Sequence, residues 1–326
     1  MVDEKRFDEQ LVEEFNIEFD FDETKFNRFL AKAKVDLDSA KEQVLYELGC
    51  GTFYNKGFFL TATGVLFFGL QPEKFFPQSY VTCVRYHGNS MASVIDRKDL
   101  YGDLVSLVDE SEAFVKRHTR LAYLFDGFKR VDIEEYPYKA IREAIINAVC
   151  HRDYPSRNNV FVNVFDDRVE VISPGTIPDN LTLKEVYGRS HPRNFKILEL
   201  FHKIDYIEKI GSGLKRMEEL MLFHGLKKPV YETNRAFFQA TFLGPKEKIL
   251  ELVKPSNVLD LHELGLNEDQ VKALNFFQNK KQFSALEYQK LLGTTKRTAQ
   301  RHLKELIKNG LISKQGIGKK TIYSMT

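Results

Sequence analysis

The spacing of apolar residues predicts three helices and two strands in the last sixty residues of the chain. Apolar positions three or four apart predict helices over Glu268–Phe277, over a short segment capped by Ser284, and over Lys296–Lys308. Strands are predicted at 311–314 and 321–324, with a glycine-bearing basic loop between them. A helix, then a helix–turn–helix, then a strand pair is the order of a winged-helix domain, which we expect over residues 267–326.

The charge of this segment favours contact with a polyanion. It carries 12 Lys and Arg against 4 Asp and Glu, a net charge of +8, so the rest of the chain, with 36 against 42, carries −6. The third helix would enter the major groove of double-stranded DNA, and the loop would lie along phosphates. The alternative is a winged helix used only for protein contacts. The expected DNA contacts are Lys296, Arg297, Gln300, Arg301, Lys304, Lys319 and Lys320.

A second informative pattern begins at a helix predicted over Tyr138–Cys150. Glu143 and Asn147 lie one turn apart on the same face of this helix. A carboxylate that polarises water, beside an amide oxygen that binds Mg²⁺, is an arrangement that suits nucleotide hydrolysis. The ExxxN spacing alone is common in helices, so the segments that follow it decide how it is interpreted.

Strands and a glycine turn follow this helix. Alternating residues predict a hairpin of 159–165 with 168–172, and the sequence SPGTIP then breaks the second strand. Gly211 and Gly213 precede a further helix, where backbone N–H groups at a helix start can approach a phosphate closely. A strand over 236–243 completes the unit.

This order resembles the Bergerat (GHKL) ATP-binding fold. It is most similar to putative transcriptional regulators, often labelled RecG-like, that join such a domain to a C-terminal helix–turn–helix. The matching stretches are LTATGVLFFGLQPEKFFPQ (60–78), EAIINAVCHRDYPSRNN (143–159), VEVISPGTIP (169–178), HPRNFKI (191–197) and IEKIGSGLKRM (207–217). Larger relatives begin with an AlbA-like domain that this sequence does not show. No GxxxxGK[ST] loop is present, which excludes a helicase motor.

The resemblance implies a set of ATP and Mg²⁺ contacts. Glu143 would activate water, Asn147 would bind Mg²⁺, and Gly175 would lie beside the nucleotide. Gly211 and Gly213 would contact the phosphates, and residues 191–194 would belong to a lid. His151 lies one turn past Asn147, and two interpretations stay open: a residue near the nucleotide, or a structural residue that ends the helix.

One position departs from the pattern. The fold usually holds adenine through an aspartate just ahead of the first glycine motif, and in this chain that position falls near Val171. We therefore expect modest affinity and poor discrimination among purine nucleotides, unless Glu170 or Asp167 has taken over adenine recognition.

The expected fold class is α+β. It has an N-terminal α/β region (1–135), a Bergerat ATPase-like α/β sandwich (136–245), a linker (246–266) and the winged helix–turn–helix domain. The charged N-terminus is no secretory signal, no apolar run reaches the length of a membrane span, and the three cysteines are far apart. These features indicate a cytoplasmic protein without a membrane partner.

Three functional hypotheses follow from the sequence. The first is a DNA-binding transcriptional regulator whose ATP-binding domain senses or uses nucleotide. The second is a DNA-binding protein whose degenerate GHKL domain binds no nucleotide and serves as the scaffold of a homodimer. The third is an active, weak Mg-dependent ATPase that remodels protein or DNA partners. The Glu143, Asn147 and glycine set favours the first, and the missing aspartate favours the second over the third.

Overall fold

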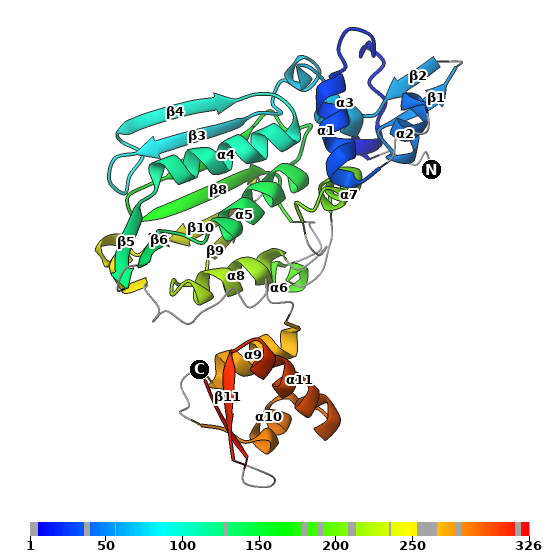
Figure 1. Cartoon of the computed structure of the whole chain (residues 1–326). Coiled ribbons are helices and arrows are strands. Elements are labelled where there is room, and N and C mark those ends of the chain that lie inside the picture. The colour runs from blue at the N-terminus through cyan, green and yellow to red at the C-terminus, as the bar shows by residue number, and fades with distance from the viewer. Residues whose placement is uncertain are drawn as a thin grey trace. The chain divides into compact units, whose positions relative to one another are not determined.

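The computed structural model describes two compact units, Met1–Leu252 and Val253–Thr326 (Figure 1). We describe each unit by itself. The described residues are 6–35, 40–55, 57–126, 129–177, 182–187, 192–207, 213–234, 236–252, 266–277, 282–316 and 321–325.

The first seventy or so residues form a helical cluster with one small hairpin. Asp22 begins α1, because its carboxylate accepts hydrogen bonds from the backbone N–H groups of Thr24 and Lys25. Every residue of α3 is buried, so this helix lies in the core. The elements are η1 (Phe7–Glu9), α1 (Glu23–Ala33), α2 (Lys41–Glu47), β1 (Gly51–Tyr54), β2 (Gly57–Leu60), α3 (Ala62–Phe68) and η2 (Pro72–Lys74).

A six-stranded mixed sheet forms the centre of the first unit. Its order is β4-β3-β7-β8-β10-β9. β3 runs parallel to β7, and all other neighbours are antiparallel. The predicted hairpin is confirmed as β7 with β8, although β8 extends to Pro174. The strands are β3 (Val81–Tyr86), β4 (Val94–Leu100), β7 (Val160–Val164), β8 (Arg168–Pro174), β9 (Val230–Thr233) and β10 (Phe237–Leu243).

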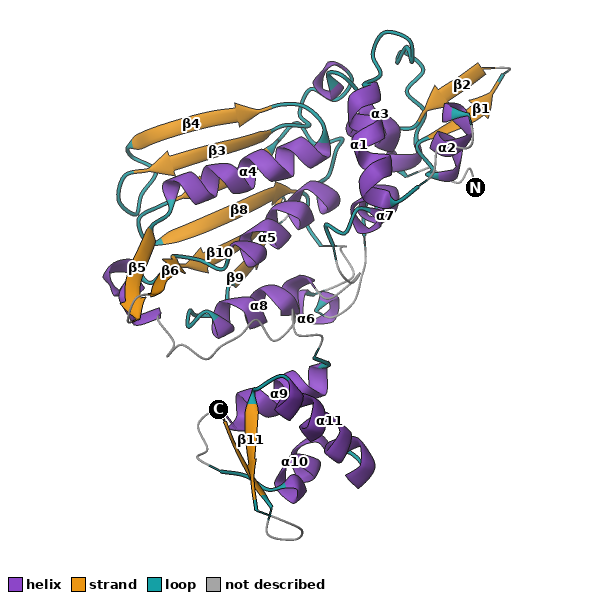
Figure 2. Cartoon of the chain, viewed as in Figure 1, coloured by secondary structure: helices purple, strands orange, loops and turns teal. Residues whose placement is uncertain are grey.

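Helices cover one face of this sheet, which gives the unit its α/β layers (Figure 2). α4 (Leu104–His118) packs on β3, β4 and β7, and α5 (Tyr138–His151) packs on β7 and β8. α8 (Gly213–Phe223) packs in turn on α5. The hydroxyl of Ser173 on β8 donates to the Ala148 carbonyl of α5 at 2.9 Å, which fixes the side of β8 that faces the helices. The mixed α+β class is therefore confirmed.

The sheet crosses the boundary that we expected at residue 135. β3 and β4 precede this position in the sequence, yet they share one sheet and one core with β7, β8, β9 and β10. The expected linker begins with η3 (Lys246–Leu252), which belongs to the first unit. The remaining elements of this unit are β5 (Leu121–Asp126), β6 (Lys129–Glu134), α6 (Leu183–Val186) and α7 (Phe195–Lys203).

The described residues of the second unit form three helices and one strand pair around their own core. Ser284 and Glu287 form a capping box at the start of the second helix, and Gly293 ends that helix at φ +59°. His302 is buried and joins the three helices, since its ring nitrogens lie 3.2 Å from Asn267 Nδ2 and 3.5 Å from the Tyr288 hydroxyl. The elements are α9 (Glu268–Phe277), α10 (Ala285–Leu292), α11 (Lys296–Lys308), β11 (Ile312–Gln315) and β12 (Ile322–Met325).

Within the described part of the chain, no helix has both the length and the apolar character that a membrane crossing requires.

Candidate functional site

Three polar residues follow one another along a single face of α5. Glu143, Asn147 and His151 are spaced four residues apart, so each lies about one turn beyond the last. Pro137 precedes the helix, where its missing N–H leaves no unsatisfied donor. Glu143 is buried, with 6% of its surface exposed, although most carboxylates stay in water. The face therefore presents a buried carboxylate and an amide together.

The start of α8 lies directly against this face. A Cβ placed on Gly213 would stand 2.6 Å from Glu143 Oε1 and 2.8 Å from Asn147 Nδ2, so these two side-chain ends would have to shift to admit one. Met217 and Met221 are fully buried and hold α8 on α5. The structure thus brings together three of the expected site residues, Glu143, Asn147 and Gly213. Gly213 fills the space in front of the two polar side chains.

Tyr231 on β9 adds a polar group near the same point. Its hydroxyl donates to the Leu214 carbonyl in the first turn of α8, at 3.1 Å. Burial raises the pKa of Tyr231, and Glu218, Tyr187 and Glu143 raise it further. The phenol therefore stays protonated at neutral pH and remains a hydrogen-bond donor.

The other end of α5 meets the end of β8. Gly175 has φ +99°, and its ideal Cβ would lie 3.0 Å from Asp153 Cβ and 3.5 Å from Arg193 Nη2. The backbone N–H of Asp153 donates to the Pro174 carbonyl at 2.8 Å, which ties the two ends together. A left-handed backbone with so little room is suited to glycine. Gly175 and His151 therefore lie at one end of the face, and Gly213 lies at the other.

His151 is neutral at physiological pH. Its pKa is lowered from 6.5 to about 4, mainly by burial and secondly by the nearby positive charge of Arg193. The imidazole can therefore donate one hydrogen bond and accept another without carrying a charge.

Asn194 has an anchoring role that the sequence did not predict. It is buried, and its Nδ2 donates to the Cys150 carbonyl at 2.8 Å and the Arg152 carbonyl at 2.9 Å. These are carbonyls at the end of α5 that the helix itself leaves unpaired. Two other expected residues, His191 and Gly211, lie outside the described residues.

The position of the expected adenine-binding aspartate is occupied by a serine. Counting two residues back from Gly175, as in DxGxG, gives Ser173 instead of Val171. The Ser173 hydroxyl is committed to the Ala148 carbonyl. The two-residue spacing was the signal that could have identified Ser173 from the sequence.

The two acidic residues considered as replacements belong to another cluster. Arg168 donates to Glu170 at 2.6 Å and to Asp167 at 3.0 Å. Side chains alternate along a strand, so Glu170 faces away from the helices that Ser173 faces. Asp167 precedes β8, at the opposite end of the strand from Gly175.

The oxygen donors at Asn147 suit a Mg²⁺ ion that is shared with phosphates. They do not suit a metal site held by protein ligands alone. No group of three or more His, Cys, Asp or Glu side chains that could hold a metal occurs among the described residues. Mg²⁺, however, is usually held by one or two protein oxygens together with substrate phosphates. Asn147 and Glu143 supply such oxygens, so their chemistry fits this ion.

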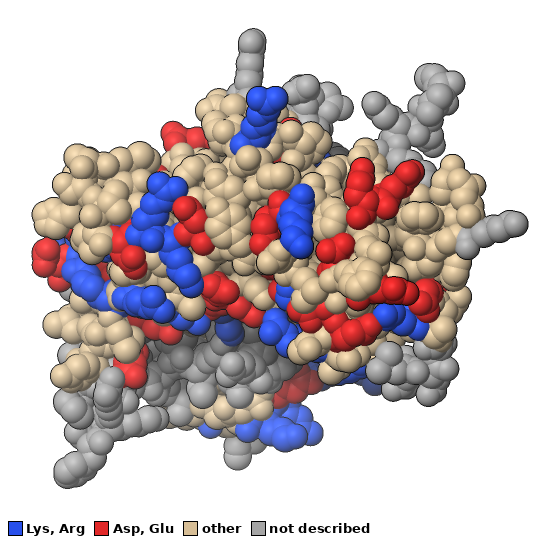
Figure 3. Space-filling view, turned by 90° about the horizontal axis from the view of Figure 1, so that it is seen from above, with Lys and Arg blue, Asp and Glu red and all other residues tan. Residues whose placement is uncertain are grey.

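In the second unit, the expected DNA-contacting side chains lie on one exposed face. Lys296, Arg297, Gln300, Arg301 and Lys304 of α11 are all exposed. The opposite face of α11 is buried through Ala299, Leu303 and Leu306. Lys319 and Lys320 lie outside the described residues. The exposed face of α11 is basic, whereas acidic and basic side chains are interspersed over the molecular face seen in Figure 3.

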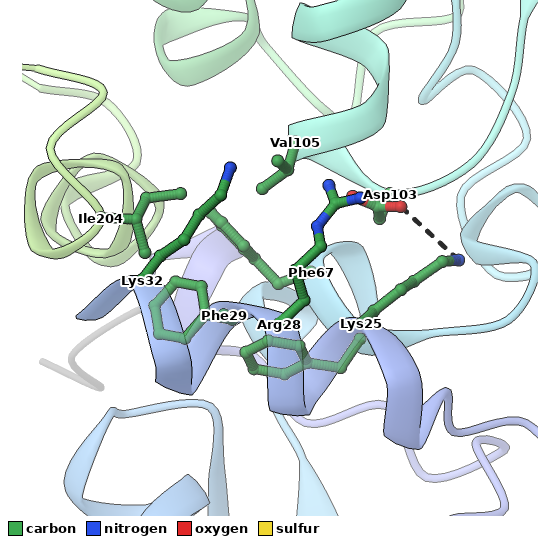
Figure 4. Close-up of a pocket in the computed structure, with 9 residues that line it drawn as sticks. Lys25, Arg28, Phe29, Lys32, Phe67, Asp103, Val105 and Ile204 are labelled. Atoms are coloured by element: carbon green, nitrogen blue, oxygen red, sulfur yellow. Dashed lines mark ion pairs between the residues drawn. The ribbon is translucent and has the colours of Figure 1, made fainter. Parts of the chain in front are cut away.

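A small surface pocket lies away from α5, between α1, α3 and the start of α4 (Figure 4). Its volume is about 270 Å³ with the open solvent at its mouth included. Lys25, Arg28 and Phe29 of α1 line it together with Phe67 of α3. The Lys25 ammonium is 3.6 Å from Asp103 and donates to the Gly69 carbonyl at 2.8 Å, so it already serves to join helices.

Comparison with known proteins places an ATPase-like segment in the first unit. Residues 158–242 match the model of a family described as "Putative ATP-dependent DNA helicase recG C-terminal". The matched segment is ATPase-like. It runs from β7 to β10 and contains Gly175 and Gly213, whereas Glu143 and Asn147 precede it. No curated protein matches the chain.

The fold as a whole is similar to that of a solved structure. The DIP2311 protein from Corynebacterium diphtheriae superposes with a TM-score of 0.61 at 19% sequence identity. The match covers 99% of this chain and 64% of that chain, so the sequence spans just under two thirds of that protein's length. At this identity the likeness concerns the fold alone.

Proposed function

We propose that the chain is a DNA-binding transcriptional regulator whose ATPase-like unit binds a purine nucleotide with Mg²⁺. The observation that carries the nucleotide part is the convergence of Glu143 and Asn147 with Gly213. Polar side chains of α5 and the glycine start of α8 meet there, and the family match supports a nucleotide in this unit. A helix start without a side chain is a favourable place for phosphate.

The roles of these residues follow from their chemistry. The amide oxygen of Asn147 would hold Mg²⁺, which would neutralise phosphate charge. Glu143 is acceptor-only when ionised, so it can orient a water molecule and take its proton. Its burial keeps bulk water away from that carboxylate. The backbone N–H groups at the start of α8 would face the phosphates, which requires α8 to give way by the width of a ligand.

The DNA-binding part of the proposal assigns a winged-helix function to the second unit. Its order of helix, capped helix, long basic helix and strand pair supports this assignment. The exposed Arg297 and Arg301 suit base edges in the major groove, because a guanidinium can pair bidentately with guanine. The net charge of +8 after residue 266 favours phosphates.

A second candidate function is a DNA-binding protein whose ATPase-like unit is a scaffold for a homodimer. The close packing of Gly213 on Glu143 and Asn147 favours this alternative, because the approach is already filled. The two candidates differ in one measurable property, which is the binding of nucleotide.

Thermal unfolding with and without Mg-ATP tests the nucleotide part. A ligand that binds only the folded state raises stability by RT ln(1 + [L]/Kd). We expect Mg-ATP to raise the melting temperature of the native chain, and Asn147→Ala to remove this increase. No increase for the native chain with any nucleotide would leave the scaffold as the function. Gel-shift titration of a chain ending at residue 266 tests the DNA part, and full affinity in that chain would refute it.

A further inference from the structure

We propose that Asp153 is the residue that recognises the base of the bound nucleotide, through an exocyclic amine. The inference rests on the proposed nucleotide function and specifies its ligand. It follows from the direction in which a nucleotide would lie along α5 and from the groups at the far end of that helix.

The orientation follows from the positions of the two glycines. Gly213 touches Glu143 and Asn147, so the phosphates belong at this part of α5. His151 lies eight residues beyond Glu143, a helical rise of roughly 12 Å. A nucleoside triphosphate that begins at Asn147 and follows this face therefore places its base at the carboxyl end of α5, where β8 also ends.

Asp153, Gly175 and Arg193 surround that point. The Asp153 backbone is fixed by its hydrogen bond to Pro174, and its Cβ lies against the Gly175 backbone. Arg193 Nη2 donates to the Thr176 carbonyl at 3.0 Å, whereas Arg193 Nη1 lies 3.9 Å from Asp153 Oδ1. This second separation is longer than a hydrogen bond. The Asp153 carboxylate, 37% exposed, thus keeps capacity to accept a hydrogen from a ligand.

Other acidic side chains near the strand are committed elsewhere. Glu170 and Asp167 are bound by Arg168, and Glu170 faces the side of the sheet away from α5. Ser173 uses its hydroxyl on the Ala148 carbonyl, and Val171 on the same side is apolar. Of these carboxylates and that of Asp153, all among the described residues, only Asp153, just after α5, lies beside Gly175.

The chemistry of a carboxylate defines the class of base. An ionised carboxylate only accepts hydrogen bonds, so it favours a base edge that carries donors. Adenine offers its 6-amino group, and guanine offers its 2-amino group with the neighbouring ring N–H. Both are purines with an exocyclic amine, and matched analogues that lack the amine separate the two.

Isothermal titration calorimetry with two pairs of nucleotides tests the proposal. ATP is compared with purine riboside triphosphate, which lacks the 6-amino group, and GTP is compared with ITP, which lacks the 2-amino group. In one of the two pairs we expect the native chain to bind the amine-bearing member about tenfold more tightly, as for a lost hydrogen bond to a charged group. Asp153→Ala should reduce that ratio to about one.

Matched variants separate this inference from the function on which it rests. Asp167→Ala removes a carboxylate at the opposite end of β8 and should keep the native ratio. Asn147→Ala should abolish binding of all four nucleotides. If Asp153→Ala binds nucleotide and keeps the native ratio, or if the native chain does not discriminate within either pair, Asp153 is not the recognising residue although nucleotide binding stands. If the native chain binds none of the four, both proposals fail.

Discussion

The carboxylate of Asp8 caps a helix that begins 187 residues later in the chain. Its Oδ2 accepts the backbone N–H of Lys196 at 2.7 Å, in the first turn of α7. Asn194, the residue before α7, makes no such cap because its side chain is directed to the end of α5. Asp8 is fully buried, and this burial raises its pKa. One acidic residue near the N-terminus thus satisfies a helix start in the middle of the sequence.

Two replacements of Asp8 should distinguish the contribution of its capping hydrogen bond to stability from the contribution of its charge. Asp8→Ala should lower the free energy of unfolding by about 1–2 kcal/mol, since it leaves the Lys196 N–H without a partner. Asp8→Asn keeps an acceptor oxygen and should cost less. Urea unfolding of the three proteins at pH 7 measures the difference, and equal losses for both variants would contradict the cap.

The raised pKa of Asp8 also predicts a pH dependence. A carboxyl group whose pKa is higher in the folded state binds its proton more tightly there, so folding is favoured below that pKa. The native chain should therefore gain stability relative to Asp8→Asn as the pH falls through the folded pKa. Unfolding free energies of the pair, measured as the pH is lowered from 7, should therefore move apart, with the native chain increasingly the more stable of the two.

His151 should act in the opposite sense. Its pKa is about 4 in the folded state against 6.5 ordinarily, so the unfolded chain binds the proton more readily. Stability should fall as the pH drops from about 6.5 to about 4. His151→Gln cannot take up the proton and should show a shallower loss over this interval. A loss of the same steepness in both proteins would mean that other groups account for it.

The stability of Gly213→Ala shows whether close packing or helix propensity dominates at the start of α8. In an open helix start, alanine would be more favourable than glycine by up to about 1 kcal/mol. Here its methyl group would meet Glu143 Oε1 and Asn147 Nδ2, so we expect a destabilisation of about 1–3 kcal/mol. Lys215→Ala, an exposed change in the same turn, should stay within about 0.5 kcal/mol. A stabilised Gly213→Ala would show that α8 stands off α5 in solution.

If the chain hydrolyses nucleotide, substitutions of Glu143 and Asn147 should impair different steps. Asn147→Ala should remove Mg-dependent binding, because the amide would hold the ion that carries the phosphates. Glu143→Gln should leave binding unchanged and lower hydrolysis, since a general base acts on water in the transition state. Calorimetry and single-turnover assays on the same preparations separate the two effects. Loss of binding in Glu143→Gln would assign this residue to the ligand itself.

The residues of α11 should divide into two classes in DNA binding. Arg297→Ala and Arg301→Ala should weaken binding and relax sequence preference, as expected for residues that read bases. Lys304→Ala should weaken all duplexes alike and reduce the slope of log affinity against log salt by about 1. Gel-shift titrations at three or more salt concentrations provide both quantities. A uniform effect for the arginines would place them on phosphates.

Local sequence signals predicted the helices well where the capping residue directly precedes the helix in the sequence. α11 spans Lys296–Lys308 as expected, and the capping residues Thr295 and Ser284 are where their types indicate. α7 was not predicted, although Ile197, Leu198 and Phe201 share its buried face. Its N-terminal cap comes from Asp8, far away in sequence, which explains why no local capping signal showed it.

The site was predictable only in the parts that lie on one helix. Glu143 and Asn147 follow from helical spacing. Gly213 was expected at the phosphates through the resemblance, and its packing against these two side chains was not predicted. Asp153 and Arg193 come from different elements, and their approach to Gly175 depends on how β8 ends beside α5. The extent of the sheet was missed for the same reason, because Val81 pairs with Val160 across almost eighty residues.

The parallel pairing of β3 with β7 bears on how the chain can be synthesised and dissected. During translation β3 and β4 emerge first, and the inner edge of β3 stays open until β7 has been made. Pairings so distant in sequence form slowly, and an uncovered strand edge invites association with other chains. An expression fragment that begins at residue 136 would leave the matching edge of β7 bare. Intact sheets therefore require fragments that start before Val81, whichever activity is to be studied.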